Sequence, residues 1–156
     1  MELWRFIGTS MRVAAVHEAL ARANFEHDVA HLSAVTASSY RLVLHQRSFP
    51  ILDATICHTT PLRVRMRAND WDDIPPAIEL LTSDGGSFAG PFPGGIFNAS
   101  PHPTTGRPFI CMRGSREFHT HTSHINEAWA QYRGQDGMDL TGILIQIASA
   151  WRGAVR

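Results

Sequence analysis

The sequence predicts an α+β fold in which helices at both ends of the chain pack against one antiparallel sheet. Three observations lead to this prediction: a helical apolar pattern near the N-terminus, short alternating runs in the middle, and a second helical apolar pattern near the C-terminus. The chain has 156 residues, 44% of them hydrophobic, which is enough for one core. We therefore expect a single domain over residues 1–156.

The first helix is predicted from Ser10 to Ala23. Apolar residues recur there at three- and four-residue intervals, as in a helix with one buried stripe: Val13, Val16, Leu20 and Ala23. Ser10 is the expected N-cap, because a serine hydroxyl can accept a hydrogen bond from an N–H group of the first turn.

The middle of the chain alternates apolar and polar positions in four short runs separated by turn residues. Such runs are typical of strands that form an antiparallel meander. The runs are Tyr40 to Leu44, Leu52 to Cys57, Leu62 to Met66, and Ile78 to Leu81.

A long loop is predicted after the strands. The segment from Ser83 to Pro108 holds six glycines and five prolines, a composition that cannot propagate a helix or a central strand. Long loops within compact domains are usually functional. Two further helices are predicted after it, from Asn126 to Arg133 and from Leu140 to Arg152.

Composition argues against several partners and sites. The 14 basic and 14 acidic side chains give a formal net charge of zero, which disfavours a nucleic-acid partner. The apolar stretch from Ile143 to Trp151 is too short to span a bilayer, and the N-terminus lacks a signal-peptide pattern. We therefore expect no membrane partner and a cytoplasmic location.

The two cysteines, Cys57 and Cys111, are too few for a disulfide framework, which fits a reducing compartment.

Cys111 is the main candidate for a chemical role. It follows the glycine- and proline-rich segment, lies two residues before Arg113, and precedes several histidines. A thiol in such surroundings is reachable, and its thiolate is stabilised by nearby positive charge. The alternative is a buried cysteine acting as a small apolar side chain. Cys57, in an alternating run, is expected in the core or on the sheet surface.

Three short motifs occur in order around this cysteine. Ile74-Pro75-Pro76 leads into a predicted strand, His102-Pro103 lies before the cysteine, and Ile110-Cys111-Met112 contains it. This order resembles the ubiquitin-conjugating enzyme (UBC) family, which has a Pro-Pro pair before its fourth strand, then a His-Pro-Asn tripeptide, then Ile-Cys-Leu at the active cysteine. The resemblance runs from Tyr40 to Trp151 and is greatest to diverged bacterial members that occur in anti-phage gene clusters.

The resemblance implies a UBC-like fold and a two-step transfer that needs no cofactor. Cys111 would accept the C-terminal glycine of a ubiquitin-like protein from a ThiF-like adenylating (activating) enzyme, hold it as a thioester, and pass it to an amine of a target protein. A thiolate is a good nucleophile near neutral pH, and a thioester stays reactive toward amines. The resemblance to bacterial members also implies a role in anti-phage defence.

The resemblance further assigns roles to residues near the cysteine. It implies that His102 holds the loop by hydrogen bonds. The family's asparagine, whose amide supports the oxyanion of the transfer step, is replaced here by Thr104. The donor must then be another group or be missing, and the candidates for it are Thr104 itself, Asn98, His119 and His121. Alternatively, Thr104 only caps a turn.

A histidine cluster follows, with His119 and His121 at alternate positions and His124 three residues further on. One interpretation is a zinc site made by these three side chains, since His-x-His pairs are common in zinc sites. The cluster also resembles the His-Thr-His-Pro segment of zinc-dependent deubiquitinating proteases of the JAB/MPN type, but residues 129–134 lack the serine and aspartate of that family. We favour a third interpretation, in which His119 and His121 line the Cys111 cleft and either lower the pKa of its thiol or deprotonate the incoming amine. In a fourth, the cluster is an exposed turn with some hydrogen-bonded rings, which fits His124 better.

Two other functions compete with the transferase. One is an inactive UBC-like module that only binds the modifier or scaffolds a complex, which the missing asparagine favours and the retained Cys111 opposes. The other is a zinc-binding hydrolase that uses His119, His121 and His124. A metal analysis of the pure protein tests the second.

Overall fold

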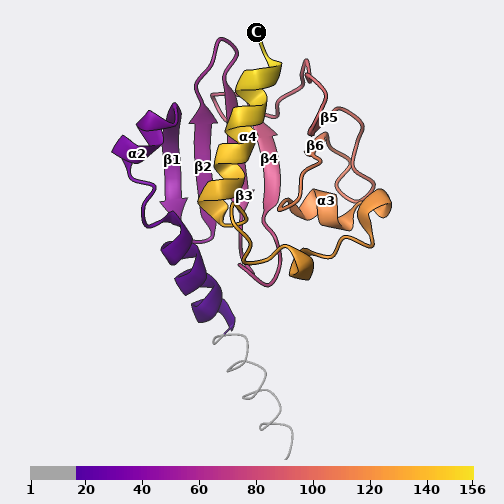
Figure 1. Cartoon of the computed structure of the whole chain (residues 1–156). Coiled ribbons are helices and arrows are strands. Elements are labelled where there is room, and N and C mark those ends of the chain that lie inside the picture. The colour runs from indigo at the N-terminus through magenta and orange to yellow at the C-terminus, as the bar shows by residue number, and fades with distance from the viewer. Residues whose placement is uncertain (1–16) are drawn as a thin grey trace, which may run out of the picture.

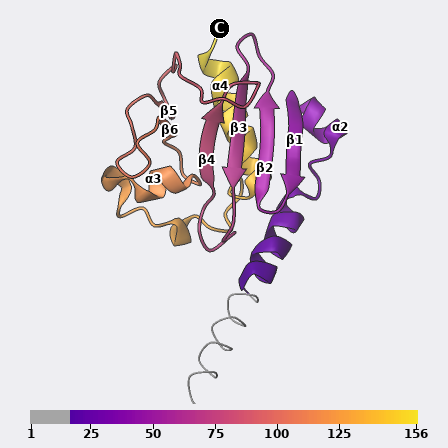
Figure 2. The same cartoon turned by 180° about the vertical axis from the view of Figure 1, so that it is seen from behind.

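The computed structural model describes residues 17–156 and has the predicted α+β architecture. A four-stranded antiparallel sheet lies at its centre, in the order β1-β2-β3-β4. Helix α4 crosses one face of this sheet, and a group of short elements lies beside β4 (Figure 1). In Figure 2 the other face of the sheet is turned toward the viewer, with α4 behind it.

The described part of the N-terminal helix covers residues 17–29. Its buried residues recur every four positions and are Ala21, Phe25 and Val29. The stripe predicted through Leu20 and Ala23 is therefore wrong: Leu20 is 57% exposed, because the buried stripe lies one residue further along the chain. The predicted start at Ser10 and the first part of that stripe lie outside the described residues.

The sheet forms a simple meander, as predicted. A short helix, α2 (Ala34–Ser39), precedes it and is capped by the Ser33 hydroxyl, which accepts the Thr36 N–H at 3.1 Å. Each strand then pairs antiparallel with the next along the chain. The strands are β1 (Leu42–Ser48), β2 (Ile51–Ile56), β3 (Leu62–Arg67) and β4 (Ala77–Leu81).

Strand alternation gives the sheet two different faces. In the β2–β3 pair, the apolar residues Leu52, Ala54 and Ile56 lie opposite Met66, Val64 and Leu62, and all six are 0% exposed. Helix α4 (Leu140–Ala154) packs on this face and buries a stripe that includes Ile143, Ile147 and Trp151. Its N-cap is Asp139, whose carboxylate accepts the Gly142 N–H at 2.6 Å. The helix predicted from Leu140 to Arg152 is thus confirmed.

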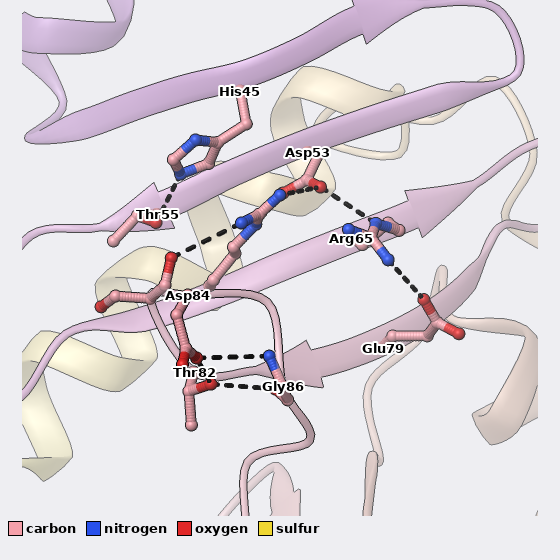
Figure 3. A network of polar contacts seen from close by, with 10 residues as sticks. His45, Asp53, Thr55, Arg65, Glu79, Thr82, Asp84 and Gly86 are labelled. Atoms are coloured by element: carbon pink, nitrogen blue, oxygen red, sulfur yellow. Dashed lines mark hydrogen bonds and ion pairs between the residues drawn. The ribbon is translucent and has the colours of Figure 1, made fainter.

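The other face carries a network of polar side chains (Figure 3). Asp53 lies at its centre, only 2% exposed, and accepts hydrogen bonds from Arg63 Nε at 2.8 Å and Arg65 Nε at 2.9 Å. Arg65 also lies 3.7 Å from Glu79 on β4. Burial acts to raise the pKa of Asp53, but the two guanidinium groups outweigh it and hold that pKa below its usual range.

The region beside β4 is where the chain departs most from regular structure. The glycine- and proline-rich segment is largely irregular, as predicted, and contains β5 (Phe97–Asn98), which pairs with β6 (Phe109–Ile110). Helix α3 (Arg116–Thr120) and the 3-10 turn η1 (Thr122–His124) follow β6. None of these short elements was predicted.

The helix predicted from Asn126 to Arg133 is wrong, since only the 3-10 turn η2 (Trp129–Gln131) forms there. A single side chain of η2, Trp129, is buried. Its indole N–H donates to the Asp72 carbonyl at 2.7 Å. A single buried side chain such as Trp129 fixes a turn, but it does not provide the apolar face that a stable helix buries against the protein.

Candidate functional site

Cys111 follows β6 directly and is partly exposed. Its N–H donates to the Ile96 carbonyl at 2.7 Å, which extends the β5–β6 pairing by one step. This hydrogen bond holds the backbone that carries the thiol, while the residue stays partly exposed. Cys57, the other thiol, is exposed near the end of β2.

His124 is the side chain that meets the thiol. Its Nε2 atom lies 3.6 Å from Cys111 Sγ. The imidazole ring stacks on Phe118, with centroids 3.9 Å apart and an interplanar angle of 19°. This stacking fixes the plane of the ring, so that Nε2 stays directed at the sulfur.

Glu127 lies behind His124. Its Oε1 atom is 3.5 Å from His124 Nδ1, a buried nitrogen that forms no hydrogen bond of good geometry. Its Oε2 atom accepts hydrogen bonds from Arg113 Nε at 3.1 Å and from the Tyr132 hydroxyl at 3.2 Å. Because Oε2 is occupied by these two donors, Oε1 remains for the histidine.

The electrostatics at Cys111 differ from the prediction. Burial raises the pKa of the Cys111 thiol, and the negative charge of Glu127 raises it further. Arg113, expected to stabilise a thiolate, instead pairs with Glu127 and lies over the Tyr132 ring. The resting sulfur is therefore a thiol near neutral pH, and it needs a base before it can act as a nucleophile.

His119 connects the two halves of the site. Its Nδ1–H donates to the Glu127 carbonyl at 2.6 Å, and its Nε2 accepts the Gly114 N–H at 3.1 Å. Burial lowers the pKa of His119, so the ring is neutral as these bonds require. With both nitrogens bound to backbone, His119 sets the spacing between the Cys111 strand and the Glu127 segment.

His102 holds the loop through hydrogen bonds of both ring nitrogens. It is 1% exposed. Its Nε2–H donates to the Glu117 carbonyl at 2.9 Å, and its Nδ1 accepts the Thr104 N–H at 3.1 Å. Glu117 in turn accepts the Ile78 N–H of β4 at 3.1 Å, so the loop is joined to the sheet through α3. Thr104 takes part through its backbone, and its side chain is exposed.

The two remaining candidates, His121 and Asn98, form hydrogen bonds with residues close to them in the sequence. His121 stacks on Phe109, with centroids 5.6 Å apart, and its Nδ1 accepts the Ser123 N–H at 3.2 Å. Asn98 accepts the Ser100 N–H through its side-chain oxygen at 2.9 Å. Both side chains thus fix local turns in the observed arrangement.

His119, His121 and His124 are not arranged as the ligands of a zinc ion. Among residues 17–156, no three His, Cys, Asp or Glu side chains converge to hold a metal ion. His119 uses both ring nitrogens for backbone groups. His121 and His124 have ring centroids 6.2 Å apart and meet different partners. The histidine cluster therefore divides into one residue at the sulfur and two that support the backbone.

The sequence predicts Cys111 as the candidate thiol but does not predict the two side chains that lie next to it, His124 and Glu127. His124 and Glu127 lie 13 and 16 residues after Cys111. Their three-residue spacing gives a usable signal only if the segment between them is helical, because that spacing places side chains on one face of a helix. Here a turn after η1, closed by the Glu127 N–H donating to the His124 carbonyl at 2.9 Å, brings them together, and no apolar periodicity marks it.

Neither a protein-family model nor a curated protein matches this chain. Within the part of the chain that the structure describes, no helix combines the length and apolar character needed to cross a membrane. The geometry around Cys111 is thus the main guide to what the molecule does.

Proposed function

We propose that this chain is a ubiquitin-conjugating-type transferase that carries a ubiquitin-like protein as a thioester on Cys111. The main support is a partly exposed thiol at the end of β6 with an imidazole nitrogen 3.6 Å away. The order of helix, four-stranded meander, irregular loop, cysteine and α4 is compatible with the UBC-like arrangement. The buried His102 holding that loop adds further support.

The chemistry requires two acyl transfers. Sγ of Cys111 attacks the carbonyl carbon of the modifier's C-terminal glycine, and the bond from that carbon to the activating enzyme's thiolate breaks. An amine of the target protein then attacks the same carbon, and the bond to Sγ breaks. Bacterial anti-phage defence is the setting that the resemblance suggests for these transfers.

The test uses an activating enzyme and a ubiquitin-like protein taken from the genome that encodes this chain. These are mixed with ATP and the wild-type chain, Cys111→Ala or Cys57→Ala, and the products are compared on non-reducing and reducing gels. We expect a thiol-sensitive adduct with the wild type and with Cys57→Ala, and no adduct with Cys111→Ala. An adduct that survives the loss of Cys111, or no adduct with any chain, contradicts the proposal.

An inactive binding module of the same fold is the second candidate, because Thr104 stands where the family has its asparagine. Such a module would bind the ubiquitin-like protein without forming an adduct. Calorimetry and the gel assay together separate the two functions, since a module binds the ubiquitin-like protein but forms no thiol-sensitive adduct in the presence of the activating enzyme and ATP.

A further inference from the structure

We infer that Cys111, His124 and Glu127 form a relay in which His124 moves the protons of both transfer steps, so that protein hydroxyl groups serve as acceptors. The identity of the acyl group rests on the proposed function, whereas the relay rests on the positions of the three side chains. It adds a base to the site and extends the acceptors from amines to serine and threonine.

Each member of the relay is positioned by contacts of its own. Cys111 is held by its N–H bond to Ile96, and His124 by its stacking on Phe118. Glu127 is held by Arg113 and Tyr132 at Oε2, which leaves Oε1 facing His124 Nδ1. A proton on Nδ1 would face this carboxylate and would leave the lone pair of Nε2 for the thiol. Catalytic hydrogen bonds are often long before substrate binds, so the distances of 3.6 and 3.5 Å are compatible with a relay.

The neighbours of the sulfur leave His124 as the base. His119 has both ring nitrogens bound to backbone, and His121 is turned to Ser123 and Phe109. Arg113 pairs with Glu127 rather than with the thiol. The buried Nδ1 of His124 has no hydrogen bond in the resting site, and Glu127 Oε1, 3.5 Å away, is the acceptor to which it can donate if the ring moves closer.

The proton movements balance in both steps. In loading, His124 Nε2 takes the Sγ proton as sulfur attacks the carbonyl carbon. The proton then passes to the departing thiolate of the activating enzyme. In discharge, Nε2 takes the proton of the acceptor O–H as oxygen attacks the thioester carbon. The C–O bond forms, the C–S bond breaks, and the proton returns to Sγ of Cys111.

The hydroxyl acceptor follows from the position of this base. A hydroxyl is a weak nucleophile unless a base removes its proton during attack. An acceptor that reaches the carbon bound to Sγ comes close to Nε2, because Nε2 lies 3.6 Å from the sulfur. The same base makes water a slower, competing acceptor.

The experiment uses p-nitrophenyl acetate, which places an acetyl group on a reactive thiol without any other protein. The acetylated chain is isolated by rapid gel filtration and mixed with N-acetylserinamide, with hydroxylamine, or with buffer alone. Intact mass follows loss of the acetyl group, and chromatography detects the serine ester. Hydroxylamine is the internal control, because it is already an unprotonated nucleophile at neutral pH and needs no base.

The variants are His124→Asn, Glu127→Gln and, as a matched control, His31→Asn at an exposed histidine after the N-terminal helix. We expect His124→Asn to slow transfer to serine about 100-fold while transfer to hydroxylamine stays within a few-fold of wild type. Glu127→Gln is expected to slow serine transfer about tenfold, because Glu127 only positions His124. His31→Asn should match wild type. In His124→Ala, added imidazole should restore part of the serine transfer.

Several results would overturn the relay. These are no acetylation of Cys111 in the wild type, no serine ester, or equal slowing of serine and hydroxylamine transfer in His124→Asn. If the adduct with the ubiquitin-like protein forms but serine transfer does not depend on His124, the relay is wrong and the transferase stands. If serine transfer depends on His124 but no adduct forms, the proposed function is wrong and the relay stands.

Discussion

At the residue scale, Glu127 exerts two effects on Cys111 that one substitution can separate. Its charge raises the pKa of the Cys111 thiol, and its Oε1 atom faces His124. In Glu127→Gln the charge that disfavours the thiolate is absent, so the pKa of the thiol should fall. We therefore predict that the pH midpoint of iodoacetamide alkylation moves to a lower value, although acyl transfer becomes slower.

The control for this measurement is Glu79→Gln, which removes an equal charge on β4. Its alkylation midpoint should match that of wild type. A midpoint in Glu127→Gln that is unchanged, or moved to higher pH, contradicts the assignment of Glu127 as the charge felt by the sulfur.

The histidines show which features of the site the sequence could predict. Cys111 was predicted because motif order and the preceding loop are visible in the sequence. The choice among His119, His121 and His124 was not, because it depends on where α3 ends and how η1 turns. Irregular turns decide which of these histidines faces the thiol, and such turns leave no periodic pattern in the sequence. The catalytic roles themselves stay predictions.

At the element scale, the four strands were predictable because alternation reflects a sheet with two different faces. The longest helix, α4, was predictable because one apolar stripe covers its whole length. The short elements beside β4 were not, because each is held by one or two specific contacts. Ser115, for example, begins α3 by accepting the Phe118 N–H at 3.1 Å.

Asp53 allows a prediction about the stability of the sheet. Removing its charge leaves Arg63 and Arg65, whose side chains are only 16% and 29% exposed, without their shared partner. Asp53→Asn should therefore lower the free energy of unfolding at neutral pH by about 3 kcal/mol. Because the folded pKa of Asp53 is depressed, its stabilisation is present above pH ~4, the usual range of a free aspartate, and is lost as pH falls below it.

Urea unfolding of wild type and Asp53→Asn at pH 7 and pH 3 measures this effect. The difference between the two chains should be large at pH 7 and smaller at pH 3. Glu79→Gln serves as the comparison, since Glu79 is more exposed and should cost less than about 1 kcal/mol. An equal difference at both pH values would show that shape, rather than charge, makes Asp53 important.

At the scale of the whole molecule, the turn that follows Cys111 contacts the hydrophobic core at Gly114. This glycine has a φ of +96°, and a Cβ built on it would lie 2.9 Å from Ile143 Cδ1. Ile143 is 0% exposed and belongs to α4. The turn three residues after Cys111 therefore presses directly on the helix that closes the core, so the position of the thiol depends on the packing of the sheet and α4.

This contact leads to a prediction about stability and activity together. Gly114→Ala should lower the free energy of unfolding by about 1–3 kcal/mol, through both the positive φ and the overlap with Ile143. It should also slow acetylation of Cys111, because the backbone that carries the thiol must shift. Adding Ile143→Val removes the overlapping Cδ1 atom, so the double variant should be more stable than the sum of the single effects predicts.

Gly153→Ala is the control, because a Cβ there meets nothing within 4 Å and alanine favours a helix. If Gly114→Ala unfolds at a lower urea concentration yet is acetylated at the wild-type rate, the core does not position the thiol.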